Sequence, residues 1–256
     1  MLIDIGVNLS HKSFANDTRE VLRSAHENGI RKLIITGTSV CESNRMIALL
    51  NQYSTKFPGM LYGTVGIHPH AASEFSNDSI ADLRHLLAQP GVVAIGETGL
   101  DFHRNLAPKE MQVKCFEAHL SLASELELPL FMHEREASKL QIDILKNRRK
   151  DFSKGVIHCF TGDRQTLYQY LDMDLHIGIT GWICDPRRGM PLQDLVADIP
   201  LDRLMIETDS PYLLPRNLAF PPKDGRNEPS FLPWVVSGIA ACRGESKEEI
   251  AEQTGI

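Results

Sequence analysis

The sequence predicts a (β/α)8 TIM barrel of the α/β class, on the basis of three observations. The chain has 256 residues, a size at which a barrel closes around one core. Short β-forming runs alternate eight times with longer segments of helical period. The runs are continuously apolar, as is typical of parallel strands that are buried on both faces. No glycine-rich dinucleotide loop follows the first run, which disfavours an open, doubly wound sheet.

The first four strands are predicted from the runs LIDIGV, KLIITG, LYGTVGI and VVAIGE. Each run precedes a stretch in which apolar residues recur with helical spacing. The predicted strands are 2–7, 32–37, 61–67 and 92–97, and the predicted helices are 17–29, 40–54, 77–89 and 108–127.

The second half continues the alternation with the runs LPLFMH, GVIHCF, LHIGIT and RLMIET, the last followed by a proline-rich loop. The predicted strands are 128–133, 155–160, 175–180 and 203–208, and the predicted helices are 136–148, 163–172, 190–198 and 229–242. No linker or low-complexity tract divides the chain, so we expect a single domain over residues 1–256.

The composition is that of an ordinary globular protein, with 42% hydrophobic and 23% charged residues. A net charge of −6 argues against attachment to nucleic acid by bulk electrostatics, which needs clustered Lys and Arg, but it permits a local basic groove. Five cysteines form no CxxC pair, which indicates reduced thiols and not a disulfide framework.

The sequence also carries no signal for a membrane or for export. The apolar runs stop well short of the ~18 residues that a membrane-spanning helix needs. Asp4 lies where a signal peptide requires positive charge. We therefore expect a cytoplasmic protein with no membrane partner. The acidic net charge and the lack of an unpartnered apolar helix stripe predict a monomer.

Four polar residues end predicted strands, and all four are of types that bind metal ions. Glu97 ends the fourth strand, His133 the fifth, His158 the sixth and Asp209 the eighth. In such barrels the carboxyl ends of the strands form the active face, so these side chains should converge at one mouth. Two imidazoles and two carboxylates are a set that binds a divalent ion. Cys159, in the sixth strand, should point away from His158.

Other polar residues near the same strand ends suit contact with a phosphate. His68 and His70 flank Pro69 after the third strand, and we favour substrate contact over metal ligation, because the proline indicates that the strand has ended. In the loop after the fourth strand, Arg104 suits a phosphate, and Asp101 is a candidate substrate-binding residue or an orienting or capping residue.

The loop after the seventh strand adds two cations. Arg187 and Arg188 in DPRRG are candidates for backbone phosphates of a nucleic acid. Trp182 either stacks on a base or packs as an ordinary aromatic residue.

At these residues the chain resembles the TatD family of metal-dependent deoxyribonucleases, within the wider amidohydrolase-like barrels. The similar stretches run in family order over nearly the whole chain: GIHPH, AIGETGLDF, MHERE, HCFTG, GITGW, IETDSPYL and RNEP. The resemblance implies a (β/α)8 fold, a divalent metal cofactor and 3′-to-5′ exonuclease action on DNA, with a part in DNA repair or turnover.

The resemblance also implies roles for individual residues. Glu97, His133 and His158 correspond to metal ligands, and Asp209 to a ligand or catalytic base. We expect Glu97 and Asp209 to be the catalytic carboxylates, with Asp209 accepting the proton of the attacking water. Magnesium is the ion that the family implies, whereas an imidazole-rich site suits zinc or manganese. Single-stranded DNA is the expected substrate, with RNA as an alternative.

The chain departs from the family pattern at two places. Many members carry an HxH pair at the end of the first strand, where this chain has Gly6 and Asn8. We therefore expect one tightly held ion and at most a weak second ion. The chain stops at EQTGI, without the family's usual Leu-Phe-Gly-like close, which leaves a shortened final helix and a truncation as alternatives.

Three other functions remain open at the level of sequence. The same barrel could hydrolyse a cyclic amide or ester, although those relatives commonly use the HxH pair and a carboxylated lysine, and no predicted strand ends in lysine. It could cleave the ester of a D-aminoacyl-tRNA. It could also be a catalytically weakened barrel that serves as a binding scaffold.

Overall fold

The computed structural model describes residues 1–255 and contains eight strands in the order β1 to β8, each followed by helical structure. This order and the parallel pairing of the strands confirm the predicted (β/α)8 class. The strands are β1 (Leu2–Val7), β2 (Ile30–Ile35), β3 (Leu61–Val65), β4 (Val92–Asp101), β5 (Leu130–Arg135), β6 (Gly155–Ile157), β7 (His176–Ile179) and β8 (Leu204–Ile206).

The helices confirm the predicted alternation and add one element. They are α1 (Thr18–Glu27), α2 (Val40–Tyr53), α3 (Asn77–Leu87), α4 (Lys109–Leu126), α5 (Ser138–Asn147), α6 (Arg164–Leu171), α7 (Met190–Leu195), α8 (Leu232–Arg243) and α9 (Lys247–Gln253). The last predicted helix begins at residue 229, three residues before the start of α8, because Pro229–Phe231 form a 3-10 turn. Helix α9 was not predicted, and Ser246 caps it by accepting a hydrogen bond from the Glu249 amide.

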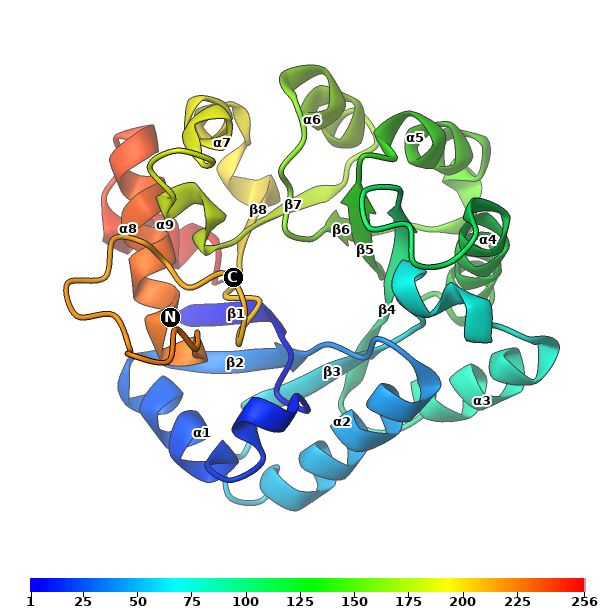
Figure 1. Cartoon of the computed structure of the whole chain (residues 1–256), viewed down its shortest axis with the longest axis horizontal. Helices are drawn as coiled ribbons and strands as arrows, with labels where there is room; N and C mark the ends of the chain where they lie inside the picture. The colour runs from blue at the N-terminus through cyan, green and yellow to red at the C-terminus, as the bar shows by residue number, and fades with distance from the viewer. Residues whose placement is uncertain (256) are drawn as a thin grey trace. The chain divides into compact units, whose positions relative to one another are not determined.

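The chain divides into two compact units. Unit 1 consists of Met1–Ile35, Tyr53–Leu61 and Ile177–Ile256, and unit 2 of Thr36–Gln52 and Tyr62–His176. In unit 1, β8 pairs with β7 (Figure 1). Val7 at the end of β1 bridges to Ser210 beyond β8. The apolar side chains of these strands are buried and form the core of the unit. The prediction of a single domain stays a prediction.

Unit 2 carries β3 to β6 as parallel neighbours, with α3, α4 and α5 along one face of the strands (Figure 1). Strand β4 is the longest strand that the structure describes. It pairs with β5 from Thr98 opposite Met132 to Asp101 opposite Arg135, beyond an irregularity in the register after Ile95. A bulge of this kind bends a strand and changes the direction of its side chains.

Strands β4 and β6 end at residues other than those predicted. Glu97 lies inside β4, not at its end, and Asp101 is the last residue of the strand, not part of a loop. Gly99 permits the extension, because a Cβ there would lie 2.0 Å from the carbonyl oxygen of His133 on β5. Strand β6 ends at Ile157, so His158 follows it directly.

The predicted end of the eighth strand and the predicted placement of Cys159 in a strand are also wrong. Strand β8 ends at Ile206, three residues before Asp209. Cys159 is not in a strand but has a positive φ of 47°, so the argument from strand alternation does not apply to it. Among residues 1–255, no helix is both long enough and apolar enough to cross a bilayer.

Candidate functional site

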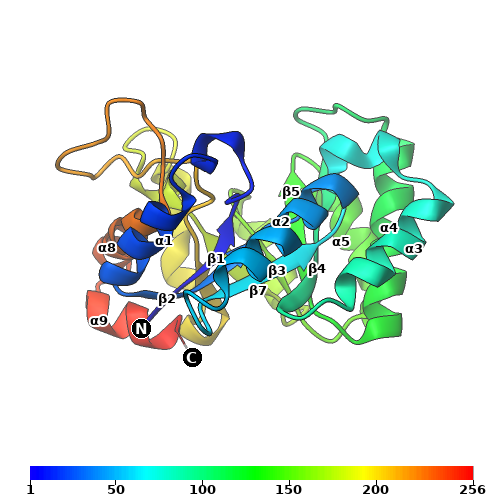
Figure 2. The ribbon, with the colours of Figure 1, turned by 90° about the horizontal axis from the view of Figure 1, so that it is seen from below.

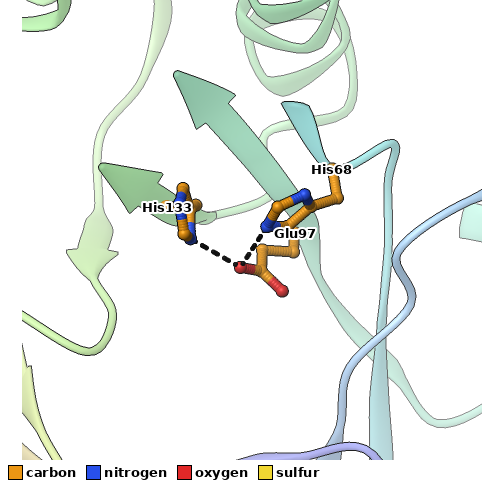
Figure 3. Close-up of side chains that lie close together, drawn as sticks. All are labelled: His68, Glu97 and His133. Atoms are coloured by element: carbon orange, nitrogen blue, oxygen red, sulfur yellow. Dashed lines mark hydrogen bonds and ion pairs between the residues drawn. The ribbon is translucent and has the colours of Figure 1, made fainter. Parts of the chain in front are cut away.

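Three histidines of unit 2 surround one carboxylate oxygen. The Oε1 atom of Glu97 lies 2.9 Å from Nε2 of His158, 3.1 Å from Nδ1 of His133 and 3.3 Å from Nε2 of His68. The four residues come from β4, β5, the segment after β6 and the segment after β3. Figure 3 shows His68 and His133 converging on Glu97. The structure thus brings together three residues that the sequence predicts as metal ligands, Glu97, His133 and His158.

The environment of Glu97 keeps its carboxylate ionised. Only 5% of the residue is exposed, and burial alone would raise its pKa. The interactions of Glu97 with His158, His68 and His133 outweigh that effect, so the pKa lies well below its usual value. A buried, ionised carboxylate ringed by imidazoles is a strong cation-binding group.

His133 lies between two carboxylates. Its Nδ1 faces Glu97, and its Nε2 is 3.1 Å from Oδ2 of Asp101. Burial lowers its pKa, but the bonds to Asp101 and Glu97 outweigh burial, so its pKa is raised. When one nitrogen of a histidine binds a metal, the other usually donates to a carboxylate or carbonyl that fixes the ring. Asp101 is placed to hold His133 in this way.

Asp101 is buried and contacts His70 in addition to His133. It is 1% exposed, and its Oδ2 also lies 2.7 Å from Nε2 of His70, while its Oδ1 accepts the backbone N–H of Arg104. Gln112 on α4 accepts the backbone N–H of Asp101 and donates to its carbonyl oxygen. These contacts favour the orienting role among those considered for Asp101, and its contact with substrate stays a prediction.

The tautomer of His68 makes it a hydrogen-bond donor at the site. Its Nδ1 accepts the backbone N–H of His70 at 3.0 Å, as the cap of the 3-10 turn Pro69–Glu74. Burial lowers the pKa of His68, so the ring is neutral and carries its one hydrogen on Nε2. That N–H points to Glu97 and has no lone pair for a cation. The geometry therefore agrees better with the predicted substrate contact of His68 than with metal ligation.

The segment that carries His68 is held by a histidine that sequence reasoning did not assign. His119 on α4 is fully buried, and its Nε2 accepts the backbone N–H of Ile67 at 3.0 Å. Its Nδ1 donates to the carbonyl oxygen of Cys115 at 2.7 Å. Burial lowers the pKa of His119 to about 4, so the ring stays neutral and keeps this tautomer. No local pattern predicts this contact, because 52 positions separate the two partners.

The donor set of unit 2 fits a divalent ion. One ligand atom from each of His68, Glu97 and His133 lies within 4.8 Å of the others, and His158 contacts the same carboxylate oxygen. With the hydrogen of His68 on Nε2, the groups left to bind a cation are Glu97 and the imidazoles of His133 and His158, each of which binds a metal in its neutral form. Two imidazoles and one carboxylate leave coordination positions for water or substrate, as in catalytic sites and unlike closed structural ones.

Asp209 follows β8 in unit 1, and neighbours from β1 fix its position. Its backbone N–H donates to the carbonyl oxygen of Gly6, and its Oδ1 accepts the side-chain N–H of Asn8 at 2.9 Å. The backbone N–H of Asn8 also donates to the carbonyl oxygen of Ser210. The two residues that replace the HxH pair therefore bind Asp209 directly.

Asn227 of the RNEP motif also fixes the turn that contains Asp209. Asn227 is fully buried and donates to the carbonyl oxygens of Thr208 at 2.9 Å and Tyr212 at 2.6 Å, which bracket Asp209 in the sequence. Two buried N–H groups of one amide thus fix both ends of the turn. The sequence of the motif alone does not predict this structural role.

The predicted phosphate-binding arginines differ in their surroundings. Arg188 bonds to Oδ2 of Asp185 through Nε and Nη2, and its guanidinium lies 4.7 Å from the ring centre of Trp182. Trp182 therefore packs against Arg188 in this loop. Arg187 and Arg104 are exposed, and their guanidinium groups point to no partner that would neutralise them among the contacts that the structure describes. All three arginines remain candidate phosphate contacts, but the guanidinium of Arg188 already contacts Asp185 and Trp182.

Comparison with known proteins places the chain in a family. The model of a family described as TatD related DNase matches residues 3–255. A protein named 3′-5′ ssDNA/RNA exonuclease TatD from Erwinia amylovora is 48% identical over 255 residues, which is 100% of this chain and 97% of that protein. A protein of the same name from Salmonella typhimurium is 42% identical over 253 residues, 99% of this chain and 95% of that protein.

Solved structures agree with this assignment. A hydrolase of the TatD family from Entamoeba histolytica has a TM-score of 0.90 at 28% identity, covering 99% of this chain and 95% of that one. YJJV, a TatD homolog from Escherichia coli K12, has a TM-score of 0.89 at 27% identity, covering 99% and 94%. A mutant organophosphorus hydrolase from Deinococcus radiodurans, at 16% identity and a TM-score of 0.63, shares the fold, covering 99% and 89%. The chain therefore belongs to the TatD-related deoxyribonuclease family.

Proposed function

We propose that this protein is a metal-dependent 3′-to-5′ exonuclease that hydrolyses phosphodiester bonds of single-stranded DNA and RNA. The observation that carries the proposal is the convergence of His68, His133 and His158 on the ionised carboxylate of Glu97. The names of the relatives supply the substrate class, and their similarity extends over the whole length of the chain.

Glu97, His133 and His158 would hold the ion, with Mg²⁺ as the working ion and Zn²⁺ or Mn²⁺ as alternatives favoured by imidazole. When bound, a divalent ion acidifies water and offsets negative charge on phosphoryl oxygens. Asp101 keeps the ring of His133 in the orientation that presents Nδ1 to the side of Glu97.

The remaining residues act on the proton and on the phosphate. Asp209, assigned from its place after β8, accepts the proton of the attacking water, and Asn8 orients its carboxylate by binding Oδ1. The Nε2–H of His68 donates to a phosphoryl oxygen, where negative charge develops in the transition state. Arg104 and Arg187 bind phosphates of the strand.

The setting of this activity is also part of the proposal. We infer a single-domain monomer of the cytoplasm, without a membrane partner, that acts in DNA repair or nucleic-acid turnover. Light scattering of the purified chain would test the oligomeric state, and a dimer would contradict it.

The decisive test uses 5′-labelled single strands of DNA and RNA with Mg²⁺ or with EDTA. We expect a ladder that shortens from the 3′ end, release of mononucleotides, and loss of both in EDTA and in Glu97→Gln. His85→Ala is the matched control, because His85 is an exposed histidine of α3 in the same unit. Turnover of D-aminoacyl-tRNA or of amides, with intact labelled strands, would refute the proposal, and inactivity on all substrates would indicate a binding scaffold.

A further inference from the structure

The loop between β8 and the turn at Pro229–Phe231 is long and carries its own anchors. Loops of this length without secondary structure are usually functional in compact domains. Figure 2 shows the loop extending from the end of unit 1 that lies opposite α9. Asp209 lies in the first residues of this loop, three positions after the end of β8, so the rest of the loop continues from a candidate catalytic residue of the same unit.

Both arms of the loop are fixed to unit 1. On the outgoing arm, the side chain of Asn217 donates to the carbonyl oxygen of Trp234 on α8 at 3.0 Å. On the returning arm, Arg226 forms ion pairs with Asp17 and Glu228 at 2.6 Å each. Both ends of the segment between the two arms are therefore held in place. A ligand that binds this segment would lose less free energy in ordering the loop.

Phe220 stands at the exposed part of this segment. It is 93% exposed, the highest value among the large hydrophobic residues of the described chain that are exposed. Two prolines follow it, Pro221 and Pro222, which restrict the backbone on one side of the ring. Arg216 and Lys223, both exposed, flank it in the sequence. A bare aromatic ring between cations is the arrangement by which proteins bind single-stranded nucleic acid.

We propose that Phe220 is a base-stacking residue that binds one unpaired nucleobase of the substrate strand, while Arg216 and Lys223 bind the adjacent phosphates. The proposal rests on the proposed function for the identity of the strand. A single strand is favoured over a protein partner because the local cations suit a polyanion and the loop continues from Asp209. It is also favoured over a duplex, in which the base faces are covered by their neighbours. Because every base has an aromatic face, the contact should not depend on sequence.

The first experiment measures KM and kcat on a single-stranded 20-mer for Phe220→Ala, Phe220→Leu and the native chain. Loss of one base–aromatic stack should raise KM by about 5- to 160-fold and change kcat by less than about twofold. Phe220→Leu keeps the apolar bulk but lacks the aromatic face, so it should resemble Phe220→Ala. Tyr168→Ala, an exposed aromatic of α6 in the other unit, is the control and should leave KM unchanged.

The second experiment does not need hydrolysis. In Phe220→Trp, binding of an oligonucleotide in EDTA should quench the new tryptophan fluorescence, relative to the native chain with its own tryptophans. If the native chain degrades no strand but the quench occurs, the proposed function fails while the stacking inference stands.

Other outcomes overturn the inference. It is wrong if Phe220→Ala leaves KM within twofold of the native value, or if no quench occurs in a chain that is an active nuclease. A full return of the native KM in Phe220→Leu would indicate apolar contact in place of stacking. A dimer that Phe220→Ala dissociates would show that the ring binds a second copy of the chain.

Discussion

Replacing Asn8 with aspartate should place two negative charges side by side at Asp209. The side-chain amide of Asn8 donates to Oδ1 of Asp209 at 2.9 Å, and both residues are half-buried. Asn8→Asp changes the donor into an acceptor at nearly constant volume. Two unit charges about 3 Å apart repel by about 5.5 kcal/mol at an effective dielectric constant of 20 and by about 1.4 kcal/mol in water. At pH 8 we expect a loss of unfolding free energy between these limits.

Charge repulsion in Asn8→Asp can be relieved by a proton or by a cation, whereas the loss of a hydrogen bond cannot. At pH 5 the two carboxylates can share a proton, so most of the stability of Asn8→Asp should return. A divalent cation between the carboxylates should also relieve it, so Mn²⁺ should stabilise Asn8→Asp more than the native chain. Asn8→Leu, which only removes a hydrogen bond to a charged group, should lose about 1.5 to 3 kcal/mol at either pH.

Urea denaturation at pH 8 and pH 5, each with EDTA or Mn²⁺, measures all of these differences. Calorimetric titration with Mn²⁺ should show one tight ion in the native chain and a second ion in Asn8→Asp. Equal losses of unfolding free energy in Asn8→Asp and Asn8→Leu at both pH values, with no response of either variant to Mn²⁺, would exclude charge repulsion between the two carboxylates. Two equally tight ions in the native chain would contradict the expectation of one.

Three further predictions concern ligands, base and fold. His133→Ala or His158→Ala should abolish metal-dependent hydrolysis while the circular dichroism spectrum is kept, and full activity in either variant would contradict its assignment as a ligand. Asp209→Asn should lower kcat at least ~100-fold with nearly unchanged KM, and a change in KM alone would make Asp209 a positioning residue. Burial raises the pKa of Asp4 to about 7, so the native chain should lose stability as pH rises from about 4 to about 7, by up to ~1.4 kcal/mol per pH unit. Asp4→Asn should remove this part of the pH dependence, and an unchanged profile from urea denaturation would show that Asp4 is ionised when folded.

The alternation of strands and helices could be predicted because it depends on local apolar periodicity. The bounds of β1 were predicted to the residue. The true end of β4 could not be predicted, because it depends on pairing with β5 past a bulge and on the close approach of Gly99 to the carbonyl oxygen of His133. Neither feature leaves a periodic signal in the sequence.

The candidate ligands could be predicted for a related reason. Parallel strands bring their carboxyl ends to one edge, so Glu97, His133 and His158 converge even where the predicted ends were displaced by a few residues. The supporting contacts could not be predicted, because they join residues far apart in the sequence. The hold of His119 on Ile67 and that of Asn8 on Asp209 both depend on tertiary packing alone.

Anomalous diffraction at the zinc edge, from crystals soaked in Zn²⁺, would locate the ion that we propose Glu97, His133 and His158 to hold. We expect one strong peak at about 2.0 to 2.2 Å from the Glu97 carboxylate and from a ring nitrogen of each of the two histidines, with His68 outside the coordination sphere. A peak that His68 coordinates in place of His158, or a strong peak remote from Glu97, would contradict this assignment.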